Sequence, residues 1–187
     1  MLDYLLSHNF ISAEEGNRII RYFERLAIKK KQYLLKRDEM ARRVYFIQKG
    51  CVRSFLTDYH GKEQTFLFGT EGYWMGNLQG FSEGARSTYN YQAIEDSVVL
   101  AIDKGSWDEL LRSEPVFMRF VSDLFRNALI VQEKRIVELF TLSAEERYES
   151  LLNDRRDILN RVPLKYIASY IGITPEFFSL MRKQRLK

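Results

Sequence analysis

Hydrophobic residues change their spacing twice along this chain, and each spacing predicts a different kind of structure. Over residues 1–30 they recur at steps of three and four with charges between them, which predicts helix. These apolar positions are Leu5, Leu6, Ile11, Ile19, Ile20, Phe23 and Leu26. Residues 32–103 instead hold short runs rich in β-branched and aromatic residues, separated by glycine-containing turns. Runs such as VYFIQKG, CVRSFLTDY, EQTFLFG and SVVLAI predict strands, and their spacing favours a sandwich or small roll.

A third pattern begins near Ser106 and is helical. Pro115 suits the first turn of a helix, and we expect this helix to run to about Phe140. Its apolar seam consists of Phe117, Val121, Leu124, Ala128 and Val131. Such a seam must be buried, either on the strand domain or against a second copy of the same helix. We expect a mixture of the two in which pairing is the stronger part.

The remaining residues predict further short helices. Ser143 and Glu146 form an S-x-x-E capping box at the start of one of them. The segment NDRRDILNRV then connects this helix to Pro163, where another helix is expected to begin.

Residues 166–185 read YIASYIGITPEFFSLMRKQR, a pattern typical of a helix-turn-helix. Two helices that cross steeply need a small residue at their contact and a turn residue that tolerates positive φ, and Ala168 and Gly172 meet these needs. Thr174 is expected to cap the second helix, with Pro175 in its first turn. The residues expected to face inward are Ile167, Ile171, Ile173, Phe178 and Met181. Together these features favour a DNA-binding motif over a plain structural hairpin.

The second helix of the motif is expected to enter the major groove with its N-terminus first. Glu176 could accept a hydrogen bond from a cytosine amino group, and Thr174 or Ser179 could reach a base edge or a phosphate. Phe177 is expected to pack against its own domain, the alternative being contact with a thymine methyl group. The expected phosphate contacts are Arg182, Lys183 and Arg185.

Charge sharpens this hypothesis only through its distribution. The net charge is +4 and the sequence pI about 9.1, a mild bias. From residue 161 onward, however, the single acid Glu176 stands against six bases. These are Arg161, Lys165, Arg182, Lys183, Arg185 and Lys187. Such a basic end is either a polyanion-binding surface or a solvated tail.

Composition disfavours several other classes of protein. The apolar runs are too short to span a bilayer and the N-terminus lacks signal-peptide features, so a cytoplasmic protein is expected. Cys51 is the only cysteine, and packing is its expected role because it cannot pair within the chain. His8 and His60 lie in separate segments, which argues against a metal site and a cupin-like enzyme. No nucleophile–base arrangement is visible in the sequence, so we do not expect the protein to be an enzyme.

The roll, the long helix and the C-terminal helix-turn-helix together resemble the Crp/Fnr family of bacterial transcription regulators over nearly the whole chain. The segment from VYFIQKG to GYWMGNLQGF is similar to the family's cyclic-nucleotide-binding β-roll, and KYIASYIGITPEFFSLMRKQ to its DNA-reading helices. The chain looks most like the short members of this family found in Bacteroidetes-type bacteria. The resemblance implies an α+β fold. A jelly-roll (double-stranded β-helix) effector domain with flanking helices would span residues 1–112, a dimerisation helix 113–140 and a helix-turn-helix domain 141–187.

The same resemblance implies how the protein would work. It predicts a cytoplasmic homodimer on a palindromic operator, with half-sites about one helical turn apart. Double-stranded DNA would be the principal partner and RNA polymerase a further one. The alternative is a ligand-sensing dimer whose helix-turn-helix meets a protein partner, an idea that the outward Leu180 and Phe177 keep open.

Departures from the family pattern concern both the ligand and the DNA. Nucleotide-binding members hold the ribose with a glycine–glutamate pair and the cyclic phosphate with an arginine–serine pair. Here the first pair reads Gly76-Asn77 and the second falls on Ser87-Thr88, while Arg86 stands one place early and should point to the other face of its strand. Cyclic AMP is therefore not expected, and the cavity either holds an unidentified small-molecule effector or is filled by bulky residues.

The DNA-reading positions depart as well. The family's base-reading arginine falls on Leu180 and another on Pro175, so the operator sequence should differ. The segment NDRRDILNRV is too short for a β-hairpin wing, and the cysteine cluster of the oxygen-sensing members is absent.

Overall fold

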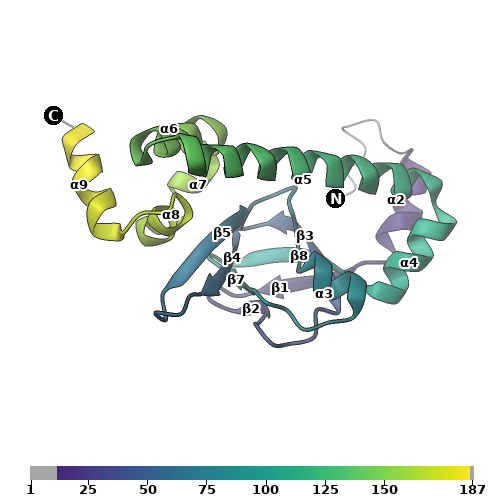
Figure 1. Ribbon diagram of the computed structural model, residues 1–187. Helices are drawn as coiled ribbons and strands as arrows, with labels where there is room; N and C mark the ends of the chain where they lie inside the picture. The colour runs from purple at the N-terminus through teal and green to yellow at the C-terminus, as the bar shows by residue number, and fades with distance from the viewer. Residues whose placement is uncertain (1–11, 186–187) are drawn as a thin grey trace.

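The computed structural model describes residues 12–185, with side chains to Lys183. A roll of strands, a long helix and a group of short helices follow one another along the chain (Figure 1). The strands are β1 (Glu24–Ile28), β2 (Tyr33–Leu35), β3 (Arg43–Lys49), β4 (Val52–Thr57), β5 (Glu63–Gly69), β6 (Trp74–Met75), β7 (Asn90–Ala93) and β8 (Ser97–Asp103). The helices are α2 (Ala13–Ile20), α3 (Leu78–Glu83), α4 (Lys104–Ser113), α5 (Pro115–Thr141), α6 (Ala144–Asp154), α7 (Arg156–Leu159), α8 (Leu164–Tyr170) and α9 (Pro175–Arg185).

The roll consists of two four-stranded sheets with strand orders β1-β8-β3-β6 and β2-β7-β4-β5. All of the pairings are antiparallel. Alternate residues of β3 and β8, such as Tyr45, Ile47, Val99 and Ala101, point between the sheets and form the interior of the roll. The predicted strands thus exist, and EQTFLFG coincides with β5.

The expected helix over residues 1–30 is wrong in its last part. Helix α2 covers only residues 13–20, and residues 24–28 form β1. β1 pairs with β8 from Glu24↔Ala101 to Ile28↔Ser97, so a partner far away in the sequence overrides the local spacing. The predicted apolar positions Leu5, Leu6 and Ile11 lie outside the described residues.

Helices α2, α4 and the first part of α5 cover the outer face of the first sheet. Phe46 and Ile102 on this face pack in one cluster with Trp107 and Phe117 from the helices. Trp107 is the centre of an aromatic group, with edge-to-face contacts to Trp74 at 5.8 Å and Phe117 at 5.4 Å between ring centroids. This packing fixes the direction in which α5 leaves the roll.

The predicted seam on α5 divides into two parts. Phe117 and Val121 are buried on the roll, whereas Ala128 and Val131 are exposed. A second apolar stripe on the same helix is exposed and was not predicted. It consists of Met118, Phe125, Leu129, Ile136 and Phe140. The roll therefore covers the first part of the predicted seam, in agreement with the expected mixture, and pairing through the rest stays a prediction.

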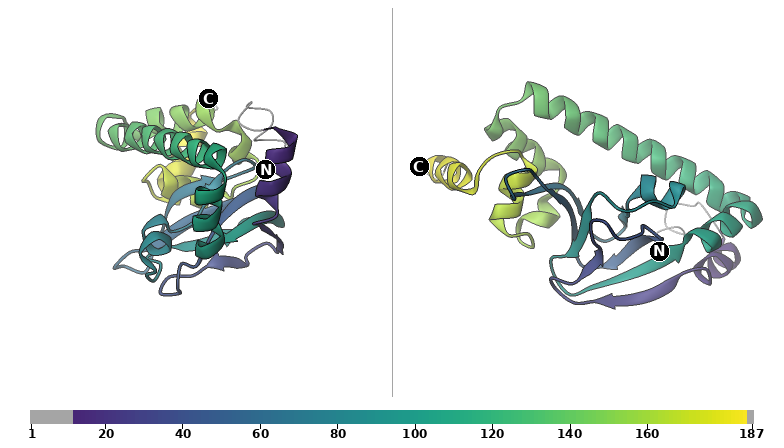
Figure 2. Two further views of the ribbon diagram at one scale, coloured as in Figure 1. Left: turned by 90° about the vertical axis from the view of Figure 1, so that its right-hand side faces the viewer. Right: turned by 60° about the horizontal axis from the view of Figure 1, so that its bottom comes forward.

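The C-terminal helices lie against the second sheet, at the opposite end of the molecule from α4 (Figures 1 and 2). Cys51, Phe68 and Ile94 of the roll belong to the same buried cluster as Ile158 and Ile167 of these helices. Cys51 is fully buried, as its expected packing role requires, and burial raises the pKa of its thiol to about 12. Over residues 12–185, the structure contains no helix of the length and apolarity that crossing a membrane demands.

Candidate functional site

Helices α8 and α9 form the predicted helix-turn-helix. Gly172 lies between them with a φ of +78°, the left-handed conformation that favours glycine. Ala168 is completely buried, and its carbonyl accepts a hydrogen bond from the amide of Ile173 at 3.0 Å across the turn. The small residue and the turn residue therefore take the places that the sequence assigned to them.

The apolar positions of the motif also face inward as predicted. Ile167, Ile171, Phe178 and Met181 are buried, and Ile173 is partly buried against the same cluster. The ring of Phe178 meets Tyr148 of α6 edge to face, with centroids 5.0 Å apart. This contact anchors α9 to the body of the domain, and it leaves the opposite side of α9 open to solvent.

Capping interactions set where the helices begin. The Thr174 hydroxyl accepts a hydrogen bond from the amide of Phe177 at 3.2 Å, which satisfies one free amide at the start of α9. At the start of α6, the amide of Ser143 donates to Glu146 at 2.8 Å, and the amide of Glu146 donates to the Ser143 hydroxyl at 3.3 Å. Both predicted caps are thus present.

The outward face of α9 carries the predicted DNA contacts. Thr174, Glu176, Ser179 and Lys183 are exposed, and Arg182 is partly exposed. The Ser179 hydroxyl donates to the Pro175 carbonyl at 2.8 Å, so it and the capping Thr174 already have partners within the helix. Hydrogen bonds from its own backbone amide and the Thr174 hydroxyl hold the pKa of Glu176 below its usual value, so this carboxylate is charged at neutral pH. The Arg185 side chain lies outside the described residues.

The expected packing of Phe177 is wrong. Its side chain is 46% exposed, and Leu180 beside it is 54% exposed. Phe178 takes the inward position next to Tyr148, which turns Phe177 toward solvent together with the polar residues of α9. The outward face therefore mixes charge with two apolar side chains.

Arg161 does not belong to the basic surface that the sequence suggested. Its guanidinium donates to both carboxylate oxygens of Glu71 at 2.8 and 2.9 Å, and to Glu95 at 3.1 Å. The two carboxylates raise the pKa of Arg161, and the guanidinium lowers the pKa of Glu71 to about 2. Arg161 joins the C-terminal helices to the roll, because an arginine held by two carboxylates cannot also neutralise a phosphate.

Arg53 makes a second connection between these parts, and the sequence reasoning missed it. It is 1% exposed, and its guanidinium lies between the rings of Phe55 and Tyr166, 3.8 and 3.7 Å from their centroids. It also pairs with Glu63 at 2.6 Å and donates to Gln92 at 2.8 Å. Tyr166 lies on α8, so this roll residue holds the first helix of the motif. The only signal in the sequence was an arginine inside an otherwise apolar run.

Backbone contacts strengthen the same junction. The Ser169 hydroxyl of α8 accepts from the Thr65 amide at 2.8 Å and donates to the Glu63 carbonyl at 3.0 Å. Arg155 donates to the Phe68 carbonyl at 3.2 Å and to the Thr70 hydroxyl at 3.1 Å. The motif therefore has one defined orientation relative to β5.

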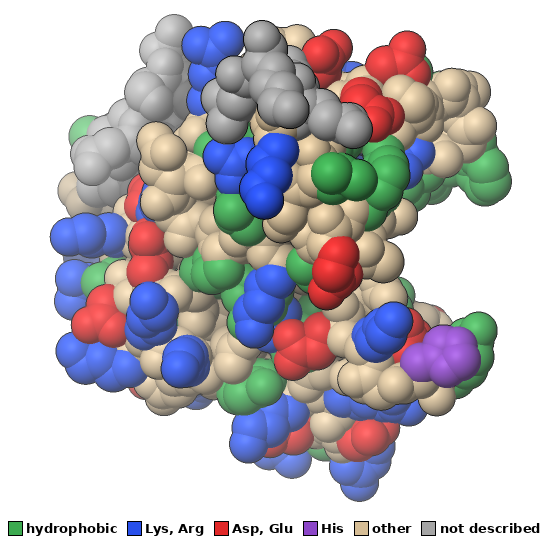
Figure 3. All heavy atoms as spheres, turned by 90° about the vertical axis from the view of Figure 1, so that its left-hand side faces the viewer, with side chains coloured by type: hydrophobic (Ala, Val, Ile, Leu, Met, Phe, Trp, Pro, Cys, Tyr) green, Lys and Arg blue, Asp and Glu red, His purple; other side chains and the backbone are tan. Residues whose placement is uncertain are grey.

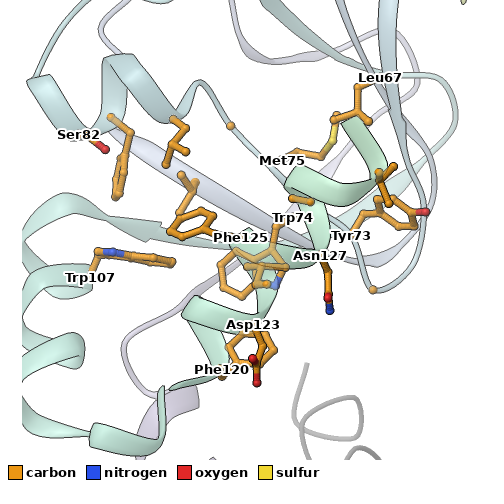
Figure 4. A pocket seen from close by; sticks show the side chains of 18 of the residues that line it. Leu67, Tyr73, Trp74, Met75, Ser82, Trp107, Phe120, Asp123, Phe125 and Asn127 are labelled. Atoms are coloured by element: carbon orange, nitrogen blue, oxygen red, sulfur yellow. The ribbon is translucent and has the colours of Figure 1, made fainter. Parts of the chain in front are cut away.

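A cavity of about 790 Å³ lies between α5, α4 and β6 (Figure 4). Its walls are largely apolar and include aromatic side chains, with Trp74, Trp107, Phe120 and Phe125 among those labelled. The charged lining residues are Glu71, Lys104, Asp108 and Asp123. Because Lys104 is paired with Asp108, the lining offers no free cation for a phosphate.

The positions aligned with the family's nucleotide contacts have structural partners of their own. Gly76 lines the cavity, but the buried Asn77 caps α3, accepting from the Gly80 amide at 2.6 Å. Asn77 also donates to the Thr88 hydroxyl at 3.4 Å. The Ser87 hydroxyl donates to the Tyr89 carbonyl at 2.8 Å.

Arg86 lies on the protein surface. It is exposed, and its guanidinium donates to the Asp38 carbonyl at 2.6 Å. The one-residue offset seen in the sequence therefore corresponds to a guanidinium that does not line the cavity. Across residues 12–185, no three side chains of His, Cys, Asp or Glu come together in a group that could hold a metal ion.

Comparison with known proteins matches residues 25–114 to the cyclic nucleotide-binding domain family. Regulatory protein HlyX of Actinobacillus pleuropneumoniae is 24% identical over 165 residues, which cover 81% of this chain and 67% of HlyX. The cAMP-activated global transcriptional regulator CRP of Salmonella typhimurium is 29% identical over 105 residues, 56% of this chain and 50% of that protein. The chain thus matches about half of the length of CRP.

The solved structures are similar over more of the chain. FixK2 from Bradyrhizobium japonicum superposes with a TM-score of 0.74 at 22% identity, covering 87% of this chain and 83% of FixK2. The match extends beyond the residues of the cyclic nucleotide-binding domain. It confirms the predicted fold class, an α+β roll followed by a long helix and a C-terminal helical domain.

Proposed function

Because the chain belongs to the Crp/Fnr family of regulators, we propose that it is a DNA-binding transcription regulator that reads an operator with α9. The single observation that carries this proposal is the outward face of α9. Its polar and basic residues are exposed, while Ala168, Phe178 and Met181 hold the helix in place from behind. A recognition helix needs one face that is packed firmly against its domain and an opposite face that is free to contact DNA.

The residues of α9 divide into base-reading and phosphate-binding positions. Glu176 and Ser179 lie in the first two turns, which enter the groove, and they are the proposed base contacts, with Thr174 serving chiefly as the cap. Arg182, Lys183 and Arg185 lie in the later turns and are the proposed phosphate contacts. Phosphate contacts fix the register of the helix on DNA but carry no sequence information.

We further propose that the protein is a homodimer paired through α5. The exposed stripe Met118, Phe125, Leu129, Ile136 and Phe140 advances in steps of seven, four, seven and four, so these side chains lie along one face of the helix and could pack against a second copy of it. Two-fold pairing would place two copies of α9 on half-sites roughly 34 Å apart, which predicts a palindromic operator. A cytoplasmic regulator of this type would act together with RNA polymerase.

An effector would bind in the aromatic cavity beside α5. Cyclic AMP is not the proposed effector, since the cavity lining offers its phosphate no free cation. A ligand lodged between α5 and the roll would touch both parts that position α9.

Selection of bound sequences from a random DNA pool at physiological salt tests the main proposal. We expect a shared, roughly palindromic motif, with relaxed preference at one position per half-site for Glu176→Ala. Recovery of no shared motif would refute the regulator function. It would instead favour a protein-binding helix-turn-helix, the second candidate, which the exposed Phe177 and Leu180 support.

A further inference from the structure

The tip of the β4–β5 hairpin, residues 58–62, adjoins the start of β5, which packs against α8 of the helix-turn-helix. The strand that leaves the tip is held to α8 at once, because Ser169 bonds to the Glu63 carbonyl and the Thr65 amide. After the hydrogen bonds from the backbone amide of Glu176 itself and from Thr174, the charge of Lys62 also contributes to holding the pKa of Glu176 below its usual value. Figure 3 views the end of the molecule that carries α9, and Lys and Arg side chains are spread over this face among acidic ones. The roll therefore reaches the surface that would meet DNA.

Hydrogen bonds make this tip rigid. Asp58 accepts from the backbone amides of His60 and Lys62 at 2.9 and 3.0 Å, and from the Gln64 side chain at 2.9 Å. Gly61 takes the turn with a φ of +78°. These hydrogen bonds also hold the pKa of Asp58 below its usual value. Because the tip is already ordered, it would lose little conformational entropy on binding.

The side chains that this rigid tip presents have few partners in the fold. Tyr59 is 92% exposed, and its ring contacts only the neighbouring His60 ring, at 3.9 Å between centroids, among the ring contacts of the described residues. Lys62 is exposed and forms no ion pair within 4.0 Å in the part of the chain that the structure describes. An exposed tyrosine and an exposed lysine are both side chains that contact the phosphates of nucleic acids.

Among residues 12–185, no β-hairpin wing stands beside the helix-turn-helix. The segment NDRRDILNRV, where a wing was considered, forms the short helix α7 and not a β-hairpin. We propose that the tip of the β4–β5 hairpin is a second DNA-contacting element, in which Lys62 binds a backbone phosphate at the edge of the groove entered by α9. Tyr59 and His60 contact the adjoining sugar–phosphate. The inference rests on the proposed function, and its partner is the backbone of double-stranded DNA.

The hydrogen bonds of Ser169 to Glu63 and Thr65 make this placement specific, because Ser169 lies five residues before Thr174, the cap of α9. A recognition helix inserts its N-terminus into a major groove about 12 Å wide, so a group beside that N-terminus faces one of the two flanking phosphate strands. Lys62 has a flexible four-carbon stem that can follow the backbone. It would contribute to affinity for every sequence alike, because phosphates are the same in all of them.

The test is the salt dependence of operator binding by the full-length protein, measured by fluorescence anisotropy on the selected operator. Each phosphate contact contributes a slope of about 0.9 in log affinity against log salt, which at 0.15 M corresponds to about fivefold in affinity. For one contact per protomer of a dimer, we expect Lys62→Ala to reduce the slope by about 2 and the affinity by about thirtyfold. The loss should be equal on operator and non-operator DNA.

The matched control is Arg112→Ala, which removes an exposed cation from α4 at the opposite end of the molecule. Circular dichroism of each variant checks that it is folded. If Lys62→Ala keeps the slope and affinity of the control while Arg182→Ala weakens binding, the inference is overturned and the proposed function stands. If the wild-type protein binds no DNA, both fall together.

Discussion

Replacing Arg53 by alanine should weaken the attachment of the helix-turn-helix to the roll. The guanidinium is sandwiched between Phe55 and Tyr166, and only Tyr166 belongs to the C-terminal helices. A desolvated cation–π contact contributes about 2 kcal/mol, and a hydrogen bond to a charged group, here with Gln92, about 1.5–3 kcal/mol. The pair with Glu63 adds little, because that carboxylate is 44% exposed and solvated.

Part of this stabilisation is offset in the native protein. One guanidinium nitrogen, Nη1 of Arg53, is buried and finds no hydrogen-bond partner among the described residues. An unsatisfied buried donor costs about 1–3 kcal/mol, so the net loss on substitution should be about 3 kcal/mol. For a chain of this length, that loss corresponds to a fall in melting temperature of roughly 6–12 °C.

A double-mutant cycle with Tyr166→Leu isolates the contact that crosses the junction. Free energies of unfolding of the wild type, Arg53→Ala, Tyr166→Leu and the double variant would come from urea titrations followed by tryptophan fluorescence. We expect a coupling energy of about 1–2 kcal/mol between the two residues. Phe55→Leu is the matched control, because it removes the ring on the roll side and leaves the junction intact. Coupling below about 0.3 kcal/mol for Arg53 and Tyr166 would show that Arg53 stabilises the roll alone and does not hold α8.

Three further predictions concern the dimer, the pH dependence of folding stability at acid pH, and the ligand. Leu129→Asp together with Ile136→Asp should convert the dimer into a folded monomer in light scattering, since both side chains lie on the exposed stripe of α5; an unchanged mass would reject that stripe as the interface. Glu71 has its pKa depressed to about 2, so its pairing stabilises the fold above the unfolded pKa near 4.5 and is lost as the pH falls toward 2. Arg161→Ala should therefore make stability less dependent on pH between about 4.5 and 2, measured by urea unfolding at several pH values, and an unaltered profile would contradict the pairing. Cyclic AMP at millimolar concentration should leave the melting temperature unchanged, whereas a clear rise would mean that the cavity binds it after all.

The sequence predicted the helix-turn-helix well because its requirements are local. Gly172 needs a positive φ, Thr174 needs a free hydroxyl next to the first amides of α9, and both conditions can be recognised within a few residues. The capping box of Ser143 and Glu146 was predictable for the same reason. Periodicity also gave the long helix, whose observed bounds differ little from the predicted ones.

The failures involve partners that are distant in the sequence. β1 forms because its backbone pairs with β8, and the local spacing of apolar residues cannot reveal a partner so far away in the sequence. On α5, two apolar stripes share one helix, and only the packed roll shows which of them is covered. Arg161 looked like part of a DNA-binding tail because nothing near it in sequence shows that Glu71 and Glu95 hold it. The exposure of Phe177 also depends on tertiary packing, because Phe178 takes the inward position next to Tyr148.

The shared cluster of Cys51, Phe68 and Ile94 with Ile158 and Ile167 has a consequence for switching. If the helix-turn-helix turned to a second orientation, these side chains would be exposed to water, so leaving the present orientation costs hydrophobic free energy. A regulatory ligand can shift that equilibrium only by the difference between its affinities for the two orientations. The free-energy preference for the present orientation therefore depends on the apolar area buried in this cluster. A substitution as small as Ile94→Val would change the ligand concentration needed to move α9.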